Sequence, residues 1–181
     1  MNNAEMKNTE NKSNLSPLFL VILAAALVLF DQLTKYLAVK YLKGNEPFVL
    51  ISNVLELHYL ENTGAAFSML EGQQWFLYII TAAFLIVAIF CLSRLMRDRK
   101  FNPIIICITV LCAGAVGNFI DRVVHHYVVD FIYFSIINFP IFNVADIYVT
   151  LGVIVLICLV LFKYKDDDFK TVFGNKNDGQ Q

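Results

Sequence analysis

The chain has 181 residues, of which 58% are hydrophobic and 16% carry a charge, and its mean hydropathy is +0.63. These values exclude an ordinary soluble domain and predict an all-α protein that crosses a membrane several times. The net charge of -1 gives no electrostatic reason to expect a nucleic acid as a partner.

Four long apolar runs follow a polar start. Residues 1–16 show no apolar periodicity and are expected to form a polar leader. The first run is too long for a cleaved signal peptide and three more follow it, so an uncleaved first transmembrane helix is favoured. Each run has about the twenty residues that cross a hydrocarbon core. The predicted spans are about residues 17–39, 75–92, 103–120 and 141–162.

The connection between spans two and three is strongly basic. Its charged residues are Arg94, Arg97, Arg99 and Lys100. Because basic loops stay in the cytoplasm, this connection places residues 1–16 and the polar tail, residues 165–181, on the cytoplasmic side. The lysines at the opposite face, which weaken this bias, are Lys35, Lys40 and Lys43.

The loop between spans one and two contains an alternating apolar pattern. Residues 49–60 are rich in β-branched, Leu and Tyr side chains. This pattern predicts a small sheet at the membrane surface, within residues 47–67. The loop closes with Asn62-Thr63-Gly64, which is either a simple turn or a place where Asn62 offers a donor and an acceptor to a peptide.

Three aspartates fall at the outer ends of the predicted spans, namely Asp31, Asp121 and Asp146. An up-down-up-down bundle brings these helix ends together. Carboxylates at membrane depth are costly and usually face a protein interior or a water-filled cavity, which favours a functional site. Asp31 and Lys35 have i,i+4 spacing, and a structural ion pair is the simpler interpretation of these two residues.

Small and polar residues share one face of span three. Gly114, Gly117, Asn118 and Asp121 recur there at three- and four-residue spacing. The glycines allow close approach either of another helix or of a ligand chain. Arg122 follows at the interface, where its guanidinium can neutralise Asp121 or donate to a carbonyl.

The segment after span three places an acid among apolar neighbours. Residues 128–134 are predicted to form an extended or re-entrant element on the outer surface, and Asp130 lies within it. Burial favours the neutral acid, and Asp146 supplies a second carboxylate with which Asp130 can share a proton. Such a pair can activate water and protonate a leaving amide. Asn143 precedes Asp146 by three residues and can orient it by hydrogen bonding.

Other chemistries have weaker support in the sequence. His125 and His126 are adjacent and therefore poorly spaced for joint metal ligation from one helix face. The four cysteines lie in apolar runs without metal-ligand or CxxC spacing. No serine or cysteine nucleophile with a base beside it is evident. The aspartates are therefore the main candidates for catalysis.

The order of these motifs resembles that of the bacterial lipoprotein signal peptidases, also called signal peptidase II. The resemblance covers about Leu18 to Lys163. Its five motifs are Asp31-Gln32-Leu33-Thr34-Lys35, Asn62-Thr63-Gly64-Ala65-Ala66-Phe67, Gly117-Asn118-Phe119-Ile120-Asp121-Arg122, Val128-Val129-Asp130-Phe131 and Phe142-Asn143-Val144-Ala145-Asp146. The chain departs from the family pattern at Ala113, where glycine is common, and at Ile147, where serine is frequent.

The resemblance implies an intramembrane aspartyl endopeptidase that removes the signal peptide from diacylglyceryl-modified prolipoproteins, cutting before the lipidated cysteine. Asp130 and Asp146 match the catalytic pair. Matches to residues that shape or support the substrate pocket are Asp31, Lys35, Asn62, Gly64, Asn118, Asp121, Arg122 and Asn143. The resemblance implies no metal or organic cofactor. The expected protein is a monomer in the bacterial inner membrane, in contact with lipids, with its site toward the outer face.

A proton-coupled transporter and a structural scaffold are the two alternatives to a peptidase. A proton-coupled transporter also places acids in a bundle, but it usually holds them near the midplane and contains repeated halves, and this sequence shows neither pattern. A purely structural scaffold does not explain why the acids converge. Phe67, Trp75 and Phe131 can line an apolar groove for a substrate, or can simply anchor the chain at the interface.

Overall fold

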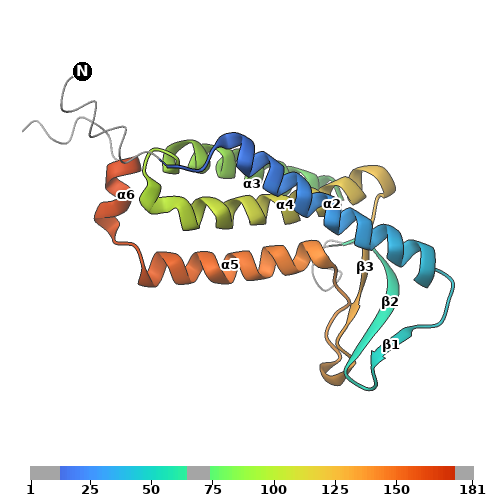
Figure 1. Cartoon of the computed structure of the whole chain (residues 1–181). Helices are drawn as coiled ribbons and strands as arrows, with labels where there is room; N and C mark the ends of the chain where they lie inside the picture. Colours follow the sequence, from blue (N-terminus) through green and yellow to red (C-terminus); the bar gives the residue numbers. More distant parts are fainter. Residues whose placement is uncertain (1–12, 65–73, 174–181) are drawn as a thin grey trace, which may run out of the picture.

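The computed structural model describes residues 13–64 and 74–173 (Figure 1). Predictions for residues 1–12, for Phe67 and for residues 174–181 lie outside this part of the chain. Four helices are long and apolar enough to cross a membrane. They are α2 (Pro17–Leu42), α3 (Gln74–Leu95), α4 (Asn102–His125) and α5 (Val144–Phe162). The predicted helical membrane fold is confirmed.

Helix α4 is the centre of the bundle, since it packs against α2, α3 and α5 and is the most buried of the four spans. Small residues bring α4 and α5 close together. A Cβ atom added at Gly114 would lie 2.7 Å from the carbonyl oxygen of Ala145, and one added at Gly152 would lie 2.6 Å from Cδ2 of Leu111. Helix packing therefore explains Gly114 without a ligand chain.

Gly114→Ala is expected to lower stability by about 1–3 kcal/mol, because the new methyl group would press on backbone of α5. Gly152→Ala is the matched control, since its methyl group meets the movable end of the Leu111 side chain and is expected to cost less. Thermal unfolding in detergent measures both. An equal loss for the two variants would contradict the packing argument.

The predicted boundaries of two spans are corrected by local structure. Helix α4 was expected to end at residue 120 but continues to His125, so Asp121 and Arg122 lie within it, and His126 ends the helix in a left-handed conformation with φ 64°. Helix α5 was expected to begin at residue 141 but begins at Val144. Asn143 caps this helix, because its side chain accepts from the backbone N–H of Asp146.

A three-stranded antiparallel sheet lies at one end of the bundle (Figure 1). Its strands are β1 (Phe48–Ile51), β2 (Leu55–Asn62) and β3 (Val128–Tyr133), in that order. The first two strands confirm the predicted sheet. Residues 128–134 were expected to form an extended or re-entrant element, but no pairing with the predicted sheet was expected. In the structure β3 pairs with β2, and Asp130 lies opposite Leu60.

The sheet is attached to the helices on both sides of β3. Val129 and Phe131 are buried against Ala38 and Leu42 of α2. Ile132 exchanges two backbone hydrogen bonds with Phe142, with N···O distances of 2.8 and 3.0 Å. This second contact fixes the segment that leads into α5. Strand β3 therefore contacts α2 on one side and the segment before α5 on the other.

The opposite end of the bundle holds a small aromatic cluster of Phe101, Tyr164 and Phe169. Phe169 belongs to a short helix, α6 (Asp166–Phe173), within the segment that was expected only to be a polar tail. An ion pair between Lys100 and Asp168 ties α6 to the basic connection before α4. The start of α2 and helix α6 therefore lie at the end away from the sheet (Figure 1).

Candidate active site

Asp130 of β3 and Asp146 of α5 are brought together by Asn143. The Asn143 side-chain amide donates to Asp130 Oδ1 at 2.6 Å, and its backbone N–H donates to Asp146 Oδ2 at 3.0 Å. The two carboxylates therefore share one bridging residue. The predicted pair is therefore close in space.

Two more asparagines complete the hydrogen bonds of this carboxylate pair. Asn62, the last residue of β2, donates to Asp130 Oδ2 at 2.8 Å, and Asn118 of α4 donates to Asp146 Oδ1 at 2.8 Å. Each of the four carboxylate oxygens thus accepts from an amide. These donors are uncharged, so they hold the carboxylates in place without neutralising both of them.

Asp130 is buried, with 2% of its surface exposed. Burial and, next, the negative charge of Asp146 raise the pKa of Asp130 from its ordinary value to about 6, although the amides of Asn62 and Asn143 oppose the shift. A carboxyl with this pKa retains a proton under mildly acidic conditions, beside a second carboxylate. The pair therefore has the features of an acid and base that share a proton.

A buried ionic cluster is connected to the pair through Asn118. Lys35 Nζ contacts Asp31 Oδ2 at 2.9 Å, Asp121 Oδ2 at 3.1 Å and Asn118 Oδ1 at 2.8 Å. The predicted i,i+4 pair of Asp31 and Lys35 is confirmed. Arg122 was one candidate to neutralise Asp121. Among the described residues, the cation that forms an ion pair with Asp121 is Lys35. Asn118 joins this cluster to Asp146.

Asp31 and Asp121 also accept hydrogen bonds from backbone. Asp31 Oδ1 accepts from Ala145 N at 2.9 Å, and Asp121 Oδ2 accepts from Val129 N at 3.1 Å. Asp31 and Asp121 are 0% and 3% exposed. Gly117 is required beside them, since a Cβ atom there would lie 2.5 Å from Asp31 Oδ2. These positions support the site from the interior.

Arg122 connects α4 to the turn after β2. Its guanidinium donates to the carbonyl oxygens of Gly64 and Asn118, at 3.3 and 3.4 Å. The Gly64 N–H in turn donates to Asn62 Oδ1 at 3.0 Å. Asn62 therefore acts both as a turn residue and as a donor to Asp130. Arg122 takes the second of its two predicted roles, that of a donor to carbonyls.

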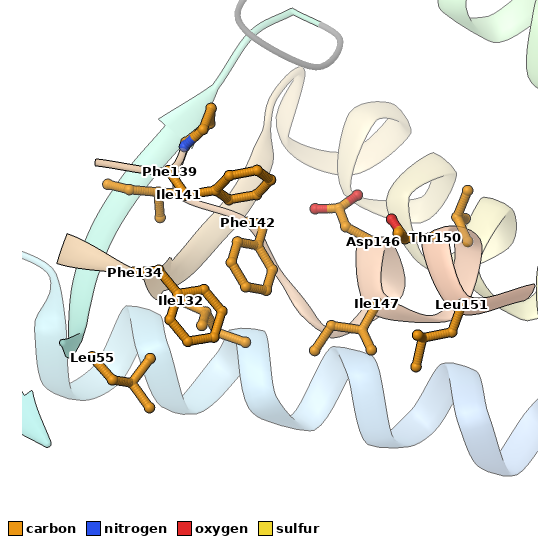
Figure 2. Close-up of a pocket in the computed structure, with 12 residues that line it drawn as sticks. Leu55, Ile132, Phe134, Phe139, Ile141, Phe142, Asp146, Ile147, Thr150 and Leu151 are labelled. Carbon is orange, nitrogen blue, oxygen red and sulfur yellow. The ribbon is translucent and has the colours of Figure 1, made fainter. Parts of the chain in front are cut away.

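An apolar groove of about 640 Å³ opens beside Asp146 (Figure 2). Among the labelled side chains, Asp146 lies between Phe142 and Thr150, and the Phe134 ring lies farther from it, beside Ile132. The other lining residues are Leu55, Ile132, Pro140, Ile141, Ile147, Val149, Thr150 and Leu151. Among the described residues, the lining of this groove includes neither Trp75 nor Phe131, and Phe131 instead lines a second apolar pocket, between α2 and the sheet.

Three features of the site were missed in the sequence. The aromatic residues of the segment 134–142 line the groove, and their signal was the recurrence of Phe around Pro140. Gln32 was missed although its side-chain amide contacts Asp31 and Asp121, and its signal was an uncharged polar residue beside an acid in an apolar span. Tyr78 of α3 donates to the Arg122 carbonyl at 2.7 Å.

Metal ligation has no geometric support in the described residues. Across residues 13–64 and 74–173, no group of three or more His, Cys, Asp or Glu side chains is arranged to hold a metal ion. His126 serves as the cap of α4, and its carbonyl oxygen accepts from Gln74.

Residues 23–162 match the family model described as signal peptidase (SPase) II. The chain is 43% identical over 136 residues to the lipoprotein signal peptidase of Brevibacillus brevis, covering 75% of this chain and 90% of that protein. It is 43% identical over 150 residues to the lipoprotein signal peptidase of Latilactobacillus sakei, covering 82% and 97%.

Two solved structures are also similar to this chain, and both are described as bacterial membrane enzymes. The first has a TM-score of 0.73 and 33% identity, covering 94% of this chain and 98% of the other. The second has a TM-score of 0.71 and 36% identity, covering 85% and 98%.

Proposed function

This chain belongs to the signal peptidase II family, and from that premise we propose that it is an aspartyl endopeptidase acting on diacylglyceryl-modified prolipoproteins. It cuts the peptide bond immediately before the lipidated cysteine. The observation that carries the proposal is the pair of carboxylates from Asp130 and Asp146, bridged by Asn143 beside an apolar groove.

The pair divides the work of hydrolysis. Asp146 removes a proton from a water molecule as the water oxygen attacks the scissile carbonyl carbon. Asp130, whose pKa is raised to about 6 by burial and by the charge of Asp146, holds the proton that the leaving nitrogen receives when the C–N bond breaks. The products are a carboxylic acid and an amine, and the pair is left with one proton in total, which now lies on Asp146.

The groove supports an apolar substrate. Its lining is almost entirely aliphatic and aromatic, and Asp146 is the acid that reaches it (Figure 2). A signal peptide and acyl chains are both apolar and both lie in the membrane, so they suit this surface. A transporter is less well supported, because the acids gather at one end of the bundle beside a sheet.

The two ends of the bundle support one orientation in the membrane. The sheet and the pair lie at one end, while α6 and the basic Lys100 lie at the other (Figure 1). Basic connections are retained in the cytoplasm. We therefore place both termini in the cytoplasm and the site toward the outer face. The chain is proposed to act as a monomer, because one chain supplies both carboxylates and their four amide donors.

The rate should depend on pH through the proton on Asp130. With its pKa raised to about 6, Asp130 loses that proton as the pH rises through this value, and the leaving nitrogen then lacks its acid. We expect kcat/KM to fall above about pH 6, since this parameter reports ionisations of the free enzyme. A peptide cleavage series between pH 5 and pH 9 measures the profile. A flat profile across this range would contradict the assignment.

The function is tested in bacteria whose own signal peptidase II is depleted. Expression of this chain is expected to convert the accumulated lipid-modified precursor of a lipoprotein to the mature form, seen as a mobility shift on a gel. The Asp146→Asn variant, expressed at the same level in the membrane, is the control. Precursor that persists in the presence of the folded wild-type chain would contradict the proposed function.

A further inference from the structure

The two supporting aspartates hold the backbone beside the catalytic pair. Asp31 Oδ1 accepts from Ala145 N at 2.9 Å, and Asp121 Oδ2 accepts from Val129 N at 3.1 Å. Each of these amides belongs to the residue immediately before one of the two catalytic aspartates. The separation of the catalytic carboxylates therefore depends on the separation of the supporting ones.

A single ammonium group joins the two supporting carboxylates. Lys35 Nζ lies 2.9 Å from Asp31 and 3.1 Å from Asp121, and all three side chains are buried. One positive charge cannot neutralise two negative charges, so this cluster retains a formal charge of about -1. A buried carboxylate with an excess charge needs further hydrogen-bond donors to stay in place.

Gln32 supplies those donors. Its side-chain nitrogen lies 2.9 Å from Asp121 Oδ1 and 3.2 Å from Asp31 Oδ2, and 3.2 Å from the carbonyl oxygen of Gly117. The amide thus forms a second bridge between the same two carboxylates. On Asp121 it contacts Oδ1, whereas Lys35 contacts Oδ2. It does so without adding charge.

We infer that Gln32 is a positioning residue, which sets the spacing of Asp130 and Asp146 through Asp121 and Asp31. The inference rests on the proposed function, because it assigns Gln32 a role in the same hydrolysis. Gln32 itself touches no substrate in this arrangement. Its effect passes through two hydrogen bonds on each side, first to a supporting carboxylate and then to a backbone amide.

Gln32→Met keeps the length of the side chain and removes the amide. We expect kcat for the lipidated peptide to fall about 10- to 100-fold, because a displacement of the order of 1 Å at the reacting groups has this effect. KM should change little, since Gln32 lies outside the groove. Thr34→Val is the matched control, because Thr34 bonds to the Asp31 carbonyl of its own helix and not to the cluster.

Hydrogen exchange measured by mass spectrometry gives a second readout that does not need activity. In Gln32→Met, the amides of Val129 and Ala145 should exchange faster than in the wild type, while helix α3 keeps its protection. Gln32→Leu removes the same amide donor without adding a charge, so it replaces the methionine variant if that variant does not fold. Rates are compared per folded molecule, counted after size exclusion.

The outcomes separate this inference from the function on which it rests. A lower kcat with unchanged KM, together with faster exchange at Val129 and Ala145, supports it. Wild-type kcat per folded molecule in the Gln32 variants overturns the positioning role and leaves the peptidase intact. A wild-type chain that cleaves no lipidated precursor overturns both.

Discussion

Asp130→Asn and Asp146→Asn are each expected to reduce turnover about 10⁴-fold or more while the protein remains folded in the membrane. An amide has nearly the shape of the carboxyl group but can neither take a proton from water nor give one to the leaving nitrogen. Each variant therefore removes one member of the acid and base pair. Initial rates of peptide cleavage by purified, monodisperse variants measure the loss.

Asp167→Asn is the matched control for these variants. Asp167 lies on α6, away from the sheet, and makes an exposed ion pair with Lys170. The same change of an acid to an amide there is expected to leave turnover at the wild-type level. Substantial turnover in either Asp130→Asn or Asp146→Asn would rule out the assigned pair.

Lys35→Met is expected to lower the free energy of unfolding by about 3–5 kcal/mol, the typical cost of removing one partner from a buried ion pair. The change leaves Asp31 and Asp121 close together without the ammonium that lies 2.9 and 3.1 Å from them. The two buried carboxylates then repel each other. Denaturant or thermal unfolding in detergent measures the loss, and reduced yield of folded protein should accompany it.

Lys43→Met provides the comparison for Lys35→Met. Lys43 also pairs with an acid, Glu61, at 2.8 Å, but its side chain is 52% exposed. Water solvates both charges when an exposed pair is lost, so the unfolding transition should move little. Equal destabilisation by the two substitutions would show that burial of the Lys35 cluster is not what makes it important for folding.

The spans and the approach of the acids could be predicted because both follow from local patterns. Continuous apolar sequence defines a membrane helix, and an alternating bundle brings every second helix end to one face. The i,i+4 spacing of Asp31 and Lys35 predicted their contact for the same reason. The closeness of Asp130 and Asp146 was expected from their chemistry and the resemblance, and the structure brings them onto one bridging residue.

The remaining features depend on contacts between distant parts of the chain. The pairing of β3 with β2 joins residues about seventy positions apart, such as Asn62 and Val128, and local alternation cannot specify that partner. The end of α4 was predicted too early because Asp121 and Arg122 lower the hydropathy of the last turns. In the fold Asp121 pairs with Lys35, and Arg122 donates to the carbonyl oxygen of Gly64.

The groove was the feature that the sequence predicted least well. Trp75 and Phe131 are aromatic and near the interface, which made them reasonable candidates, but Phe131 turns toward α2 and the groove lies on the other side of β3. Which face a strand residue takes follows from the pairing of the strand, and that pairing was unknown. The turn that brings Phe139 and Phe142 beside Asp146 likewise depends on backbone contacts to β3.

Mass spectrometry of the cleavage products tests the central claim most directly. Purified protein in lipid nanodiscs is incubated with a prolipoprotein peptide, with and without diacylglycerol on its cysteine, beside the Asp130→Asn variant. We predict one cut, immediately before the lipidated cysteine, in the wild type alone and with the lipidated peptide alone. Cleavage at another bond, equal cleavage without the lipid, or cleavage by Asp130→Asn would contradict the account.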